Sequence, residues 1–416
     1  MKLLSIPTLF FIISIFSCRN ISQIKVDSSN EIKISIPTKI EEIRLGKYSD
    51  IFDSIRIVKL ETNNQSMIGR IDRIIAHGDK YFILDQVERK AVIEFDSNGK
   101  FLKVIGEIGS GKGKYKEPND ISISNDQLVV WVNNFQKFLI YDMNGNFLKE
   151  VRVKSFGKSG AMLNDGSFAL YMDIGGDMKT AEAFDLKIFN SDGDQIHTGF
   201  EKLNKDFSRR IFFFSQNNGQ TLISPGYSSY IYSLTNNTLS KKYQIDFGEK
   251  SIPENSAANF VSLRQFIVWL NKSEYAYLST YHETDGFLIF NFSYHASIYT
   301  CFYSKKSRRL KFANSWFNNV NGFFPGVVNS VCGNNVISYY DPSTIDTYKK
   351  GHQAPTDIKQ AQVLAVNANK YFMEQLGQNI NLAPSDFHYS QKQIDLLNSI
   401  QPSDNPILLV QRLKEF

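Results

Sequence analysis

A unit of 46 to 48 residues repeats through the middle of the chain, and this spacing restricts the possible folds more than any other feature. Three segments share an alternating apolar strand, then Asn-Gly or Asp-Gly, then a second strand: residues 91–104, 138–151 and 186–196. Asn-Gly and Asp-Gly favour type I′ turns, because both central residues then take positive φ. Each segment therefore predicts a tight β-hairpin that buries one face.

A further pair of short strands precedes each of the first two hairpins. These pairs are residues 71–75 with 81–84 and residues 121–123 with 128–132. Four short antiparallel strands in each unit, without a helical period, are typical of a β-propeller blade. More diverged stretches at 221–245 and 275–312 predict a fourth and a fifth blade, and residues 327–339 open a sixth.

Each end of the chain carries a strand that the repeat leaves unpaired, at residues 55–60 and 406–413. Pairing both with the sixth unit would complete its blade and remove open sheet edges. We therefore predict an all-β fold, a six-bladed β-propeller of four-stranded antiparallel blades. A length of 416 residues alone suggests two or three domains, but the repeat reduces this to a single domain at 31–416.

Two segments near the C-terminus depart from the strand pattern. Residues 358–376 are periodic and stop before Gly377, a residue that often terminates helices, and residues 391–400 predict a second short helix. Together they predict a small helical insertion at about residues 355–400.

The first residues predict the cellular location of the protein. Met1-Lys2 and a mostly apolar run to Phe16 are typical of a secretory signal peptide, at residues 1–17. The sequence Ile15-Phe16-Ser17-Cys18 resembles a bacterial lipobox, which implies that Cys18 is acylated and becomes the mature N-terminus; Phe16 departs from the usual residue there. The alternative is a plain signal peptide in which Cys18 is incidental. We expect residues 18–30 to form a flexible tether, and the lack of an acidic cluster after Cys18 favours the periplasmic side of the outer membrane.

Several motifs resemble known propellers. Residues 105–123 look like the blade junction of NHL-type propellers: Gly-rich, then aromatic, then Pro, then a strand. Residues 61–62, 281–284 and 404–409 resemble a family of six-bladed β-propeller lipoproteins of Gram-negative anaerobes. The likeness covers roughly residues 30–414. It implies the fold and membrane anchoring, but no reaction, no catalytic residues and no cofactor.

No local motif predicts a cofactor or nucleic acid. Residues 106–113 nearly match a phosphate-binding loop, but Gly113 replaces the Ser or Thr, and a strand follows instead of a helix. The histidines lack metal-ligand spacing, so any metal site would have to gather ligands from different blades; they are His77, His197, His282, His295, His352 and His388. The net charge of +5 is small and spread along the chain, so it does not indicate nucleic-acid binding.

Two groups of residues allow both a functional and a structural interpretation. Cys301 and Cys332 could pair in an oxidising compartment, or remain buried free thiols. His282 and Glu283, with Asp285 beyond, could form an acid/base group at a strand end, or simply close a turn.

Charged and aromatic runs also leave alternatives open. The densest basic run is either a solvated hairpin face or a contact for anionic headgroups or acidic glycans; it comprises Lys305, Lys306, Arg308, Arg309 and Lys311. The aromatic runs at 212–214 and 323–324 are either core or, at a channel mouth, platforms for sugar rings.

Our leading hypothesis is a non-enzymatic, lipid-anchored propeller of the cell envelope that binds a ligand, or a protein or glycan partner, across one face. The helical insertion would cover one rim and could face the partner. The rival is a carbohydrate hydrolase or lyase whose residues converge in the central channel. Paired carboxylates or several histidines in a deep pocket would favour the rival, and a channel plugged by aliphatic side chains would oppose it.

Overall fold

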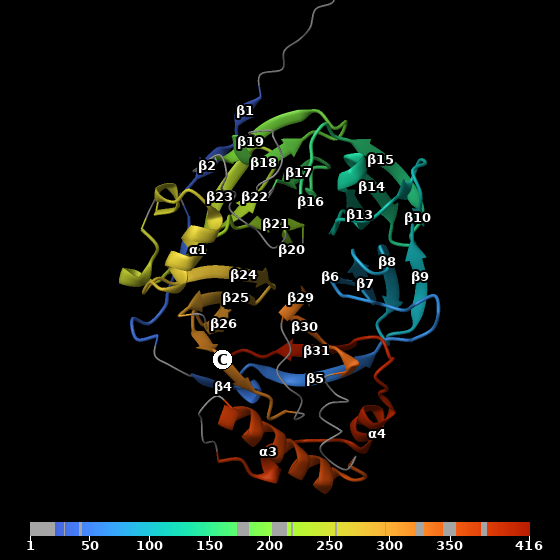
Figure 1. Ribbon diagram of the computed structural model, residues 1–416, viewed down its shortest axis with the longest axis vertical. Helices are drawn as coiled ribbons and strands as arrows, with labels where there is room; N and C mark the ends of the chain where they lie inside the picture. The colour runs from blue at the N-terminus through green and yellow to red at the C-terminus, as the bar shows by residue number, and fades with distance from the viewer. Residues whose placement is uncertain are drawn as a thin grey trace, which may run out of the picture.

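Six antiparallel sheets surround a central axis in the computed structural model of the chain (Figure 1). The structure describes residues 21–28, 30–40, 44–172, 183–201, 214–217, 219–253, 256–295, 297–320, 328–343, 355–375 and 381–416. Each sheet contains one four-stranded antiparallel blade, numbered here in chain order, and the predicted six-bladed β-propeller is confirmed.

The first three blades follow the sequence repeat directly. Blade 1 comprises β6 (Arg73–His77), β7 (Lys80–Asp85), β8 (Ala91–Asp96) and β9 (Phe101–Ile105). Blade 2 comprises β12 (Asp120–Ser124), β13 (Gln127–Val132), β14 (Lys137–Asp142) and β15 (Phe147–Arg152). Blade 3 comprises β16 (Ser159–Met162), β17 (Phe168–Tyr171), β18 (Phe184–Phe189) and β19 (Gln195–Glu201).

The diverged units form the remaining blades. Blade 4 comprises β20 (Ser215–Asn217), β21 (Gln220–Ile223), β22 (Tyr230–Leu234) and β23 (Thr238–Asp246). Blade 5 comprises β24 (Tyr277–Glu283), β25 (Phe287–Tyr294), β26 (Ser297–Ser304) and β27 (Leu310–Ala313). Blade 6 comprises β29 (Val328–Cys332), β30 (Asn335–Tyr340), β31 (Ile407–Leu413) and β5 (Phe52–Lys59).

Blade 6 closes the ring with strands from both ends of the chain, as predicted. The strand β31 pairs with β30 on one side and with β5 on the other, and Leu409 lies opposite Ile57. Blade 6 therefore has four strands, as its neighbours do.

Apolar cores lie between the blades. Each of the six blade-to-blade interfaces holds a cluster of buried side chains from both neighbouring sheets. Aromatic rings pack across these interfaces; those of Phe138 in blade 2 and Phe168 in blade 3 stack with centroids 4.6 Å apart. Both faces of a blade are therefore buried, which explains why β13 is apolar along most of its length rather than alternating.

The predicted type I′ turns in the repeated hairpins are wrong. Only the glycine of each turn has positive φ: 86° at Gly99, 74° at Gly145 and 91° at Gly193. The turn is a type I turn followed by a bulge at the glycine. It is favoured because the Oδ1 of Asp96 accepts hydrogen bonds from the backbone N–H groups of Asn98 and Lys100, both at 2.9 Å.

The N-terminal residues pair with the outer edges of two blades. The strand β1 (Ser22–Gln23) lies parallel to β19, and β2 (Lys25–Asp27) and β3 (Ile32–Ser35) lie parallel to β23. We call these three strands the N-terminal strap. The expected flexible tether at 18–30 is therefore wrong for residues 22–27, because the outer strands of blades 3 and 4 offer free backbone partners.

Helices lie outside the ring. The insertion near the C-terminus contains α3 (Ile358–Gln375) and α4 (Gln391–Ser399) beside blade 6 (Figure 1); the predicted stop at Gly377 lies outside the described residues. An additional helix, α1 (Leu263–Asn271), precedes blade 5, and the hydroxyl of Ser262 caps it by accepting from the N–H of Gln265. Another short strand pair, β4 (Leu45–Lys47) with β28 (Ser315–Phe317), links the N-terminal region to the chain after blade 5.

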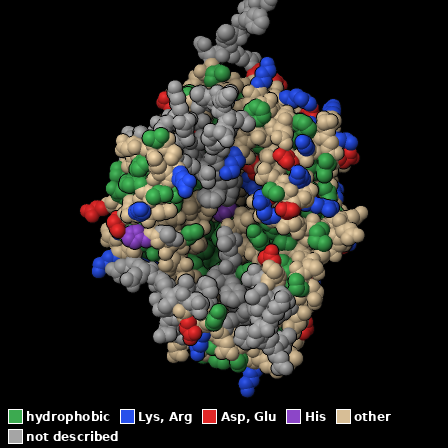
Figure 2. Space-filling model, in the orientation of Figure 1, with side chains coloured by type: hydrophobic (Ala, Val, Ile, Leu, Met, Phe, Trp, Pro, Cys, Tyr) green, Lys and Arg blue, Asp and Glu red, His purple; other side chains and the backbone are tan. Residues whose placement is uncertain are grey.

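No helix in the described part of the chain is both long and apolar enough to cross a membrane. On the face seen in Figure 2, Lys and Arg side chains are interspersed with Asp and Glu, and the surface is hollowed near its centre.

Candidate functional site

A cavity of about 410 Å³ occupies the central channel. All six blades contribute to its lining, mainly through the carboxyl-terminal ends of their innermost strands and the turns that follow. Its polar lining consists of Arg73, His77, Ser124, Asn125, Asp126, Asn164, Ser215, Gln216, Asn217, His282, Asn329 and Ser330. Amides and hydroxyls therefore outnumber charged groups, and the described lining contains no aromatic ring other than the two imidazoles.

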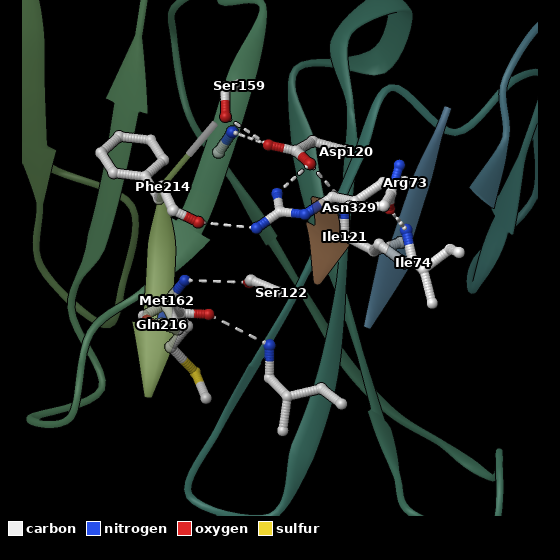
Figure 3. Close-up of polar contacts among 12 residues, drawn as sticks. Arg73, Ile74, Asp120, Ile121, Ser122, Ser159, Met162, Phe214, Gln216 and Asn329 are labelled. Atoms are coloured by element: carbon white, nitrogen blue, oxygen red, sulfur yellow. Dashed lines mark hydrogen bonds and ion pairs between the residues drawn. The ribbon is translucent and has the colours of Figure 1, made fainter. Parts of the chain in front are cut away.

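An ion pair between blades 1 and 2 organises the inner end of the channel (Figure 3). The Nη1 of Arg73 donates to the Oδ1 of Asp120 at 2.5 Å, and its Nη2 donates to the carbonyl oxygen of Phe214 at 2.6 Å. The Oδ2 of Asp120 accepts from the hydroxyl of Ser159 and from the N–H of Gly160. Because both charged side chains are about nine-tenths buried, this network fixes four blades relative to one another.

Side chains from other blades also cap the inner strand edges. The N–H of Ile74 donates to the Oδ1 of Asn329 at 2.9 Å, and the N–H of Ile123 donates to the Oε1 of Gln216 at 3.2 Å. The Nε2 of Gln216 in turn donates to the carbonyl oxygen of Met162 at 2.8 Å (Figure 3). An innermost strand has no further strand to pair with, so these amides satisfy backbone groups that would otherwise be open.

The electrostatics of the cavity are close to neutral. Burial, with a smaller effect from nearby Arg73, lowers the pKa of His282 to about 3, so this imidazole is uncharged at neutral pH. At the mouth, the Nε2 of His77 lies 3.0 Å from the Oδ1 of Asp126. The positive charge of Arg73 is balanced by Asp120.

The proposed acid/base group is not assembled. His282 lines the cavity, but the adjacent Glu283 points to the other face of β24, as alternation along a strand requires. Glu283 is held between the Nζ of Lys242 at 2.7 Å and the Nζ of Lys305 at 2.6 Å. Burial alone would raise its pKa, but hydrogen bonds from these lysines and from Tyr243 outweigh burial and lower it. Glu283 is therefore a structural ion-pair centre between blades.

The glycine-rich segment at 106–113 forms a junction between blades 1 and 2. The short strands β10 (Glu107–Ile108) and β11 (Lys114–Tyr115) pair in parallel, and the next element is the strand β12. The hydroxyl of Tyr115 donates to the carbonyl oxygen of Ile105 at 2.5 Å. A strand after this segment lacks the amide-rich end that a helix offers to phosphate groups, so the structure gives no support to nucleotide binding here.

The remaining candidates are dispersed. Cys301 is buried in blade 5, and Cys332 lines the cavity in blade 6; both thiols are free, and burial raises their pKa values. Lys311, in the basic run, donates to the carbonyl oxygen of Asp50 at 3.0 Å and lies over the ring of Phe416. At least part of that run is therefore packed against the protein.

Other predicted residues have different outcomes. Phe214 is fully buried, whereas its two aromatic neighbours and residues 323–324 lie outside the described residues, as do Cys18 and His352. Within the described chain, no three His, Cys, Asp or Glu side chains are placed to hold a metal ion.

Sequence reasoning missed the residues that organise the channel. Arg73 and Asp120 stand 47 residues apart, which is one repeat, and each begins the innermost strand of its blade. A charged residue at the same position of successive units was the available signal. Gln216 and Asn329 gave no such signal, because their units had diverged.

Comparisons with known proteins agree with the fold. The structure is similar to that of the Bacteroides fragilis NCTC 9343 protein BF0058, described as a "putative exported protein", with a TM-score of 0.65 and 18% identity over 92% of this chain and 100% of that one. A DUF4221 family member from Bacteroides vulgatus ATCC 8482 matches with a TM-score of 0.43 and 8% identity, over 87% of this chain and 97% of that one. No curated protein matches the sequence.

The profile of one sequence family, described as "Domain of unknown function (DUF4934)", matches residues 31–412. This match spans all six blades and the helical insertion, and the chain therefore belongs to the DUF4934 family.

Proposed function

We propose that this protein is a lipid-anchored scaffold of the cell envelope that binds a polar, uncharged ligand, or a polar segment of a partner, at the mouth of the central channel. The observation that carries this proposal is the cavity of about 410 Å³, which all six blades line and to which blades 2, 3, 4 and 6 contribute amide and hydroxyl side chains. Such groups offer both donors and acceptors without net charge, and a few well-placed polar groups in a preformed concavity are typical of ligand sites.

Binding explains this lining better than glycoside hydrolysis does. That reaction generally requires two carboxyl groups flanking the scissile bond. Within the described lining the only carboxylate is Asp126, and it is paired with His77 at the mouth. The carboxylate of Asp120 lies deeper and already accepts hydrogen bonds from Arg73, Ser159 and backbone N–H groups.

The proposed location in the cell envelope rests on the lipobox-like sequence that ends at Cys18. The description of BF0058 as a "putative exported protein" supports secretion. Acyl chains contribute about 0.8 kcal/mol per buried CH₂ group, so a multiply acylated cysteine holds a protein on a membrane without a spanning helix. Cys18→Ala should move the protein from the membrane fraction to the soluble fraction. Unchanged fractionation would contradict lipidation.

Two variants test the cavity. Asn125→Ala and Asn217→Ala remove amides from its rim, and Asn98→Ala, on the outer hairpin of blade 1, serves as the matched control. Detergent-solubilised envelopes and a glycan array provide the candidate ligands. We expect a ligand that the wild type retains to be retained by the control and lost by both rim variants. Equal retention by all three would contradict binding at the cavity, and absence of any ligand for the wild type would contradict the scaffold.

A further inference from the structure

The N-terminal strap carries two sets of apolar side chains. Ile24 and Ile34 are 6% and 3% exposed and pack into the cores on either side of blade 4. Ile21, just before β1, together with Val26 and Ile32, remains 53%, 54% and 41% exposed. The first set fastens the strap to the blades, while Ile21, Val26 and Ile32 remain partly exposed along the outer edge of blades 3 and 4.

The beginning of the strap is fixed on the rim of blade 3. Ser22 lies opposite His197 in the parallel pairing, and its hydroxyl is 2.9 Å from the Nδ1 of that histidine. The N–H of Ile24 donates to the carbonyl oxygen of Thr198 at 2.7 Å. Further along, the Nζ of Lys33 pairs with the carboxylate of Asp246 at 2.9 Å on blade 4. Figure 1 shows β1 and β2 at the outer edge of the ring, beside β19 and β23.

Cys18 precedes Ser22 by four residues. Even a fully extended chain spans at most about 3.6 Å per residue, so an acyl group on Cys18 keeps the rim within roughly 14 Å of the lipid surface. From this short reach and the three exposed apolar side chains of the strap region we infer that the propeller stands edge-on against the lipid bilayer, with the strap and the rim of blades 3 and 4 at the contact. This inference rests on the lipid anchor proposed above.

Two consequences follow from this mounting. The charged side chains of the strap region sum to zero; they are Lys25, Asp27, Glu31 and Lys33. The contact therefore relies on acyl chains and apolar side chains, and it should be insensitive to salt. The channel axis lies roughly along the membrane surface, which leaves the cavity mouth open to the aqueous compartment.

The experiment uses the full lipoprotein, reconstituted into phosphatidylethanolamine and phosphatidylglycerol vesicles that contain a nitroxide-labelled lipid. In a Cys332→Ala background, single cysteines replace Val26 on the strap, Glu201 on the rim of blade 3, or Leu102 on the outer strand of blade 1. Each carries a fluorophore that the nitroxide quenches on close approach. Leu102 is the matched control, because it is an exposed rim residue of a blade that the strap does not cover.

We expect strong quenching at positions 26 and 201, little at position 102, and the same pattern at high salt. Equal quenching at all three positions would overturn edge-on mounting in favour of a flat or freely turning disc. Quenching at position 26 alone would overturn edge-on mounting, because it would mean that the strap detaches from the blades and binds the membrane by itself. Failure of the protein to float with the vesicles would overturn the lipid anchor itself, and the inference with it.

Discussion

Two glycines with nearly the same φ angle allow a controlled test of how the ring is closed. Gly99 ends the outer hairpin turn of blade 1 with φ 86°, and Gly166 lies in a turn of blade 3 with φ 82°. A Cβ on Gly99 would lie 2.3 Å from the carbonyl oxygen of Lys59, in the closing strand β5, whereas a Cβ on Gly166 would have nothing within 4 Å. The N–H of Glu61 also donates to the carbonyl oxygen of Gly99 at 2.7 Å.

Both Ala variants incur the left-handed conformational penalty, about 1–2 kcal/mol. Gly99→Ala must also displace backbone of β5, which strains packing and a hydrogen bond, and adds about 2–3 kcal/mol. An unfolding entropy of about 2.1 cal/mol/K per residue over roughly 390 residues gives about 0.8 kcal/mol/K, so Tm should fall by about 4–6 °C for Gly99→Ala and about 1–2 °C for Gly166→Ala.

Scanning calorimetry measures both losses, and hydrogen exchange locates them. Exchange in β5 and its partner β31 should be faster in Gly99→Ala and unchanged in Gly166→Ala, because only the first substitution disturbs the strand that closes the ring. Equal Tm losses in the two variants would refute the argument that the repeated turn packs against the preceding blade.

Three further outcomes follow from the buried groups. The folded state lowers the pKa of His282 to about 3, so between about pH 6.5 and 3 only the unfolded chain binds the proton. The free energy of unfolding should therefore decrease as the pH is lowered, by up to about 1.4 kcal/mol per pH unit. His282→Gln should flatten this pH dependence, as measured by urea unfolding. Asp120→Ala leaves Arg73 buried without its carboxylate and should lower the free energy of unfolding by about 3–5 kcal/mol, and Asp120→Asn by less; equal stability of wild type and Asp120→Ala would contradict the ion pair. Maleimide should modify Cys332 slowly in the native protein and Cys301 only after unfolding, as measured by mass spectrometry; native labelling of Cys301 would contradict its burial.

Ring closure was predictable because its signals are local. Residues 55–60 and 406–413 each read as strands without a neighbour in the repeat, and a closed propeller uses both. The strap was missed because residues 22–35 contain only short, mixed stretches, whose pairing depends on edges that exist only after blades 3 and 4 have formed. The turn type was missed for a different reason: the Asp96 carboxylate, three residues before Gly99, decides it by accepting two backbone hydrogen bonds.

The cavity was the least predictable feature, and propeller geometry explains why. Outer hairpins meet equivalent surroundings in each blade, so the same turn and packing residues serve repeatedly. The channel is a single space that all six innermost strands share, so each blade contributes different side chains to the lining of one cavity. The backbone of Ile74 is satisfied by Asn329, 255 residues away, and that of Ile123 by Gln216, 93 residues away. A repeat search therefore locates the scaffold, whereas binding specificity should be sought at the inner-strand positions where the blades differ most from one another.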